Sequence, residues 1–210
     1  MSIVWPCGLS VDAYAAAGRN VEVPRPDCPR CFVPMVMWSG YERSVREAGL
    51  CVKIFCHRAR CSSCRVSDVL LPSFVLVGRL DVAETVGAVI TAVVSGASGV
   101  RPVARAAEVP HTTARGWCWR FGARAADLAV SFAALSVEIS GAVMTPGSSR
   151  ANDALAAIRA AFDAACDLPG WLVLGLWRFA SVVSGGGLIA TNTNMPYLVI
   201  GKRRFMPPVP

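Results

Sequence analysis

The sequence predicts a mainly α-helical protein with a small four-cysteine β-ribbon, followed by a helix-turn-helix and a C-terminal helical region. Three observations predict this fold class. Two Cys-x-x-Cys pairs enclose β-prone runs, helical periodicity begins at Leu80, and residues 103 to 117 have the pattern of two helices crossing at a tight turn. The chain has 210 residues, enough for one ordinary domain or two small ones.

The composition predicts a folded chain with a substantial core, because 54% of the residues are hydrophobic and only 17% are charged. Mean hydropathy is high, at +0.47, so a membrane protein must be considered. The longest charge-free apolar stretches are shorter than the roughly 20 residues that a membrane-spanning helix needs. We therefore expect buried helices, no membrane and, since no secretory signal precedes them, a cytoplasmic protein.

The chain divides into four segments at changes of pattern and at turn-forming residues. The expected segments are an N-terminal extension (1–24), a four-cysteine ribbon (25–75), a helical helix-turn-helix domain (78–142) and a C-terminal helical region with a basic tail (149–210). Strands are expected at 33–38, 51–55 and 66–71, with 43–49 as a connection. Helices are expected at 80–93, 101–107, 111–125 and 171–183, with 128–139 either continuing the third or starting another, and one more beginning after Ser149 as N-cap; strand-like pieces follow at 188–200.

The two cysteine pairs predict a metal site. Two sulfurs three positions apart on a tight turn can face one ion, and two such turns complete a tetrahedral shell. Four thiolates favour Zn²⁺ and leave no open position, so the zinc is expected to be structural. The ligands are then Cys28, Cys31, Cys61 and Cys64, with 29 residues between the pairs.

Other interpretations of the cysteines stay open. The four thiols could be buried or reactive without metal, and Cys51, Cys56 or His57 could compete as ligands. Cys56 and His57 are adjacent, however, and neighbouring side chains on a strand point to opposite faces. The odd total of nine cysteines and the absence of a signal argue against a secreted disulfide framework.

The ribbon is basic, which suits contact with phosphates. Residues 25 to 65 hold eight basic and three acidic side chains, a net charge of +5 in a chain of net charge +7. Arg58 and Arg60 are the expected phosphate contacts. Trp38 and Tyr41 lie among these charges and suit base stacking, or they cover a very small core.

Residues 103 to 117 have the internal positions of a helix-turn-helix. Val103 and Ala107 face inward from the first helix, Val109 fills the turn, and Ala114 and Trp117 face back from the second helix. An ordinary helical hairpin is the alternative. One residue departs from the pattern: Glu108 stands where many such motifs have a glycine with positive φ, which costs a non-glycine residue about 1 kcal/mol.

The outward residues of this motif are the candidate DNA contacts. Residues at the start of the second helix reach base edges in a major groove, and arginines around them suit phosphates. The candidates for bases are His111, Thr112, Thr113 and Arg115, and those for phosphates are Arg101, Arg105, Arg120 and Arg124. His111 could equally be a polar residue that starts the helix.

These motifs together resemble a known family. They occur in the order Cys28-x-x-Cys31, Tyr41-x-Arg43, Cys61-x-x-Cys64, Leu-Leu-Pro-Ser-Phe at 70–74 and Trp117-x-x-Arg120-Phe121. The chain resembles actinobacterial zinc-ribbon/helix-turn-helix proteins of unknown function, which are similar to the N-terminal DNA-recognition region of insertion-sequence transposases. The resemblance covers about residues 25 to 125 and implies DNA binding near a mobile element.

The sequence does not predict an enzyme. A metal-dependent transposase needs three carboxylates on alternating strands and helices, whereas the acids after residue 125 lie on alanine-rich helical segments. We expect a zinc-containing protein that binds double-stranded DNA at the nucleoid, as a transcriptional regulator or as an accessory factor of a mobile element or recombinase. Two alternatives remain: an adaptor that docks a recombinase or transposase, with Leu174, Trp177 and Phe179 as its apolar surface, or a catalytically incomplete transposase remnant. A homodimer also remains open.

Overall fold

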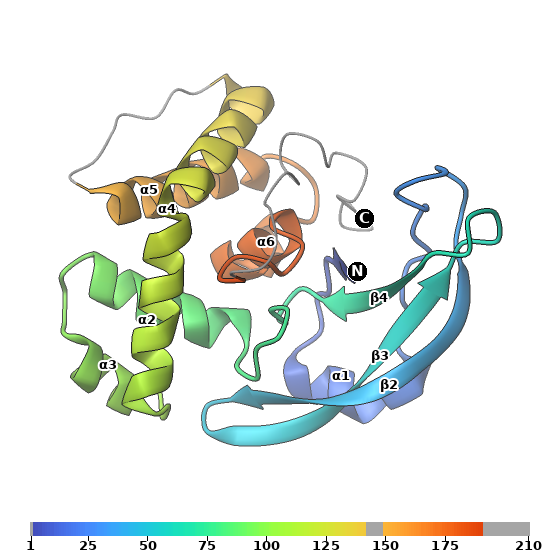
Figure 1. Ribbon diagram of the computed structural model, residues 1–210, viewed down its shortest axis with the longest axis horizontal. Coiled ribbons are helices and arrows are strands. Elements are labelled where there is room, and N and C mark those ends of the chain that lie inside the picture. Colours follow the sequence, from blue (N-terminus) through green and yellow to red (C-terminus); the bar gives the residue numbers. More distant parts are fainter. Residues whose placement is uncertain (1, 142–148, 191–210) are drawn as a thin grey trace.

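The computed structural model describes residues 2–141 and 149–190 and places a β-sheet beside a group of helices (Figure 1). The strands are β1 (Ser2–Trp5), β2 (Val36–Glu47), β3 (Leu50–Arg60) and β4 (Ser67–Pro72). The helices are α1 (Val11–Ala17), α2 (Ala83–Val94), α3 (Val100–Ala106), α4 (His111–Ser140), α5 (Arg150–Cys166) and α6 (Leu176–Val183), with 3-10 turns η1 (Gly18–Asn20) and η2 (Leu172–Leu174). A mainly helical chain with a small sheet is therefore confirmed.

The sheet is dominated by a long hairpin of β2 and β3. Strand order is β1-β4-β3-β2, and β2 pairs with β3 from Val36 opposite Arg60 to Glu47 opposite Leu50. The turn has only two residues, Ala48 and Gly49, both with positive φ (45° and 75°), as a tight hairpin turn requires. The prediction of a connection at 43–49 is wrong, because paired strand continues through Glu47.

The N-terminal residues contribute to the sheet and the core, although their sequence has no periodic signal. β1 pairs with β4 in parallel, and Ile3, Val4 and Trp5 are buried. Helix α1 starts at the N-cap Ser10, whose hydroxyl accepts from the backbone of Ala13. The segment predicted as an extension thus forms an edge strand and a helix packed on β3.

Helices α2, α3 and α4 pack on one another, and α4 is the longest element of the helical half (Figure 1). It continues unbroken from His111 to Ser140, so 128–139 extends the preceding helix. Helix α5 packs along α4 and begins as predicted at Ser149, whose Oγ accepts from the backbone N–H of Asn152 at 3.3 Å. Among the described residues no helix is both long and apolar enough to cross a bilayer.

The expected helix at 171–183 is interrupted by Gly175, which has a φ of 77° and separates η2 from α6. Leu174, Trp177 and Phe179 are only 6%, 9% and 0% exposed. The prediction that they form an apolar docking surface is wrong, because they fill the core against helices α2 and α5. Of the strand-like pieces expected at 188–200, residues 188–190 form a turn, and the rest, with the basic tail, lies outside the described residues.

Candidate metal centre and nucleic-acid interface

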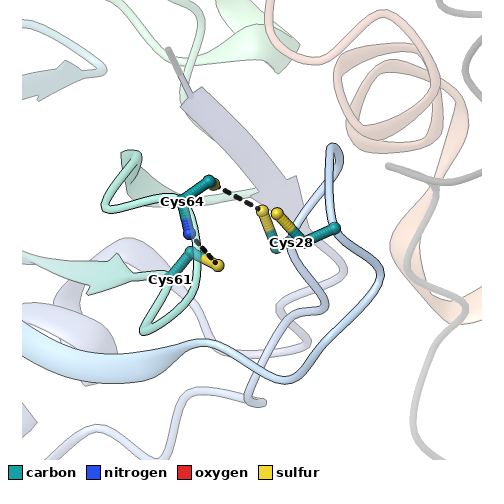
Figure 2. Close-up of side chains that lie close together, drawn as sticks. Cys28, Cys61 and Cys64 are labelled. Atoms are coloured by element: carbon teal, nitrogen blue, oxygen red, sulfur yellow. Dashed lines mark hydrogen bonds between the residues drawn. The ribbon is translucent and has the colours of Figure 1, made fainter.

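The structure brings the four predicted cysteines together. Their sulfur atoms all lie within 4.8 Å of one another, and those of Cys28 and Cys64 are 3.5 Å apart. Sulfurs around one zinc ion at about 2.3 Å would be about 3.8 Å apart in a regular tetrahedron. Figure 2 shows Cys28 on one loop facing Cys61 and Cys64 on the other. The donor set and its size fit a closed structural metal site.

Both cysteine loops have the same backbone fold. The residue after the second cysteine donates its N–H to the first cysteine's carbonyl: Phe32 to Cys28 at 2.9 Å and Arg65 to Cys61 at 3.1 Å. Phe32 and Arg65 also share a positive φ (57° and 64°). The same loop is therefore built twice, even though neither copy has the glycine that this conformation favours.

Backbone dipoles favour the thiolate within this cluster. The N–H of Cys64 points at the sulfur of Cys61 and, with smaller contributions from other donors, lowers the pKa of the Cys61 thiol to about 7. Burial instead raises the pKa of Cys56 to about 11. Among the described residues only the four predicted cysteines form a metal-ligand cluster, so Cys51, Cys56 and His57 do not compete.

The predicted helix-turn-helix segment corresponds to α3, a short turn and the start of α4. Val109 is 8% exposed, Ala114 is fully buried and Trp117 is 2% exposed, so these inward positions are confirmed. Glu108 has a φ of 54°, the conformation expected at this point of the turn. Its side chain lies against Gly49, which brings the hairpin tip to the α3–α4 turn.

The predicted DNA contacts differ in exposure. Those that are exposed are Thr112, Arg115, Arg101 and Arg105, whereas His111, Thr113 and Arg120 are half-buried. Arg124 is buried and donates to the carbonyl of Ala190, so its prediction as a phosphate contact is wrong. No sequence pattern indicates this, because an arginine on a helix normally reaches solvent.

The ribbon arginines lie elsewhere, at the end of the hairpin that adjoins the cysteines. Both are half-buried: Arg58 donates to the hydroxyl of Ser67 at 3.0 Å, and the guanidinium of Arg60 lies 4.7 Å from the ring centre of Trp38. Trp38 and Tyr41 are 60% and 42% exposed, so they do not cover a small core. At about 3.3 Å per residue, the 12-residue strand β2 separates this end from the hairpin tip by about 36 Å.

Comparison with known proteins assigns no function to the start of α4 or to the hairpin end near the cysteines. No protein-family model matches the chain, and neither a curated protein nor a solved structure matches it.

Proposed function

We propose that this protein contains a structural zinc ion and binds double-stranded DNA through a helix-turn-helix formed by α3 and α4. The observation that carries the proposal is the exposed, basic start of α4 beside a turn closed by the buried Val109. Its role is transcriptional regulation, or assistance to a recombinase or mobile element, at the nucleoid. The resemblance of the motifs to zinc-ribbon/helix-turn-helix proteins implies the same role.

The start of α4 carries side chains that can contact the base edges of DNA. Thr112 and Arg115 are exposed on its first turns, where side chains of such helices reach base edges. Arginine binds the two acceptors of guanine, and threonine contacts a phosphate or a thymine methyl. Arg101 and Arg105 extend from the neighbouring α3 and supply phosphate contacts.

Basic groups outnumber acidic ones at this surface, although Glu47 of β2 lines a groove together with Glu108 and with Pro102 and Val103 of α3. Between residues 99 and 124 the one carboxylate is that of Glu108, and its Oε2 lies beside Gly49 of the hairpin tip. The arginines therefore set the local potential, which attracts the phosphate backbone at long range.

Zinc would supply structure rather than chemistry in this proposal. Cys28, Cys31, Cys61 and Cys64 would hold it in a closed shell of four thiolates. Because Cys61 directly follows β3, the ion would fix the end of the long hairpin opposite its tip.

Binding of a randomised duplex pool, followed by sequencing of the bound fraction, tests the proposal. The R115A variant should relax the sequence preference, and R101A should weaken binding to all sequences and lower the salt slope by about one. R159A is the matched control, because Arg159 is exposed on α5, away from α3. If R115A and R159A select the same sequences as the unaltered protein, α4 does not read bases.

We propose a second copy of the chain as a partner for the exposed side of α4. Opposite its buried side, the helix has an uncharged, exposed stripe in which Trp119, Val130 and Val137 are 67%, 68% and 45% exposed. Exposed alanines at 123, 126 and 134 continue it at steps of three and four residues. This spacing over about 27 Å is that of a seam between paired helices.

The stripe is one narrow side of a single helix, whereas a specific interface buries at least about 1,000 Å². We therefore expect a weak, concentration-dependent dimer. Sedimentation over a concentration series should show dimer for the unaltered chain and monomer for V130E. The control A156E, at an exposed alanine of α5, should still dimerise. A monomer at all concentrations would eliminate the dimer and leave the DNA proposal standing.

A further inference from the structure

We propose a second nucleic-acid site, for a single strand, on one face of the β2–β3 hairpin near the cysteine cluster. This face, here the ribbon face, consists of Trp38, Tyr41, Arg43, Arg58 and Arg60. The site is separate from the start of α4 and does not depend on the duplex-binding proposal.

Strand register places these residues on one side of the hairpin. Arg58 and Arg60 are two positions apart on β3 and so share a face. Ser39 of β2 is directly opposite Arg58, and Tyr41 and Arg43 follow it at two-residue steps. Two strands thus contribute aromatic and cationic side chains to one face, which also includes the buried Ile54 and Cys56 of β3.

A bulge adds Trp38 to this row. The register between β2 and β3 shifts between Met37 and Ser39, which leaves Trp38 as the extra residue. Its ring is 60% exposed and has the guanidinium of Arg60 4.7 Å from its centre. An exposed indole with one neighbouring cation is a platform on which a base can stack, with its phosphate near the arginine.

The opposite face of the hairpin is occupied by the N-terminal helix. Tyr14 of α1 donates its hydroxyl hydrogen to the carbonyl of Phe55, and Arg19 of η1 lies 4.9 Å from the Phe55 ring centre. The Phe55 ring also covers Gly40, which lies on that side of β2. The two faces therefore have different neighbours. On the ribbon face Ile54 and Cys56 of β3 are buried, and among the described residues the exposed part is the β2 side at Trp38 and Tyr41.

Charge on the ribbon face favours a polyanion. Arg58 and Arg60 lie on it beside Trp38, whereas Arg43 donates to the carbonyl of Arg79. Glu42 belongs to the other face, where it pairs with Lys53 at 3.9 Å. Arg58 is held by its hydrogen bond to Ser67 of β4 at 3.0 Å. A cation fixed in this way loses little side-chain entropy when it meets a phosphate.

The row ends at a pocket of about 340 Å³. Tyr41 and Arg43 line it together with Val69 and Leu71 of β4 and the glycine-rich loop 184–187. This volume lies in the range of small-ligand sites, and the lining is mainly apolar with one guanidinium. Such a pocket can take the ring of an unstacked base.

A single strand fits this surface better than a duplex. Bases in a duplex stack on one another and offer only their edges, whereas those of a single strand can stack on Trp38 and Tyr41. DNA and RNA share this chemistry, so the experiment includes both.

The test measures fluorescence anisotropy of labelled oligo(dT), oligo(U) and a duplex of mixed sequence with the zinc-loaded full-length chain at fixed salt. We expect W38A to weaken single-strand binding about tenfold and Y41A to weaken it also. L172A is the control, because Leu172 is 67% exposed but lies in η2, outside both proposed sites. W38F should restore much of the binding. Tighter binding of oligo(dT) or of oligo(U) shows whether the natural ligand is DNA or RNA.

Different results would contradict the duplex-binding proposal and the single-strand proposal. Loss of single-strand binding in W38A but not in R115A supports the inference even if no duplex is bound. Single-strand binding that is equal in W38A and L172A overturns it, as does a W38A defect that is as large for the duplex. Zinc content and circular dichroism of each variant show that the hairpin has kept its fold.

Discussion

Arg46 on β2 and Asp81 ahead of α2 form a two-bond ion pair that joins the hairpin to the helical half of the molecule. Nε lies 2.7 Å from Oδ1, and Nη2 lies 3.0 Å from Oδ2. The backbones of the two segments also pair there, since the N–H of Arg46 donates to Leu80 at 2.8 Å and that of Val82 to Arg46 at 3.1 Å. This contact fixes where the hairpin tip meets the α3–α4 turn.

Removing one partner of this pair should destabilise the whole chain. Asp81 is 4% exposed and Arg46 is 22% exposed, so D81A leaves a half-buried guanidinium without its anion. We expect a loss of about 2 kcal/mol in the free energy of unfolding. E42A removes the exposed Lys53–Glu42 pair and should cost less than about 1 kcal/mol. Urea unfolding measures both, and equal effects would show that the Arg46–Asp81 contact is not structural.

Glu108 gives a prediction of opposite sign. Its φ of 54° is strained for a residue with a Cβ, so E108G should raise the free energy of unfolding by about 1 kcal/mol. E108A is the control, because alanine removes the carboxylate but keeps the strain. A loss of stability in E108G, measured by urea unfolding, would mean that the contact with Gly49 outweighs the backbone term.

Local patterns predicted the parts of the molecule that depend on short spacings. Cys28, Cys31, Cys61 and Cys64 could be assigned because each pair needs only a tight turn. The buried side chain of Val109 followed from its place between two helical patterns.

Long-range contacts were not predictable in the same way. β1 pairs with a strand more than 60 residues away in sequence, at Ser2 opposite Val69, and nothing near Ser2 indicates that partner. Trp177 could have formed a surface or a core, and only the packing of α6 against α2 buries it. Arg124 is buried and donates to the carbonyl of Ala190, a partner 66 residues away that no local pattern connects to α4.

The buried thiols of Cys7 and Cys56, outside the cluster, should make the free energy of unfolding depend on pH above pH 9. Burial raises the pKa of Cys7 and of Cys56 from 9.0 to about 11. The unfolded chain therefore releases these protons at lower pH than the folded chain, so their contribution to stability is complete below pH 9 and falls between about pH 9 and 11. Urea unfolding at a series of pH values should show this decline, and C56A should make it shallower. The same slope in C56A and in the exposed-site control C51A would assign the decline to other groups.

Metal analysis tests the cysteine cluster directly. The purified chain should hold one zinc ion, and C28S or C61S should lose it, because three thiolates and a hydroxyl bind zinc much more weakly than four thiolates. C51S is the matched control: Cys51 is exposed on the same hairpin and lies outside the cluster. Native mass spectrometry counts the ion, and thermal unfolding with and without a chelator reports its effect on the fold. The chelator should lower the midpoint in the unaltered chain and in C51S but have no further effect in C61S. A full zinc complement in C61S would place the ion elsewhere.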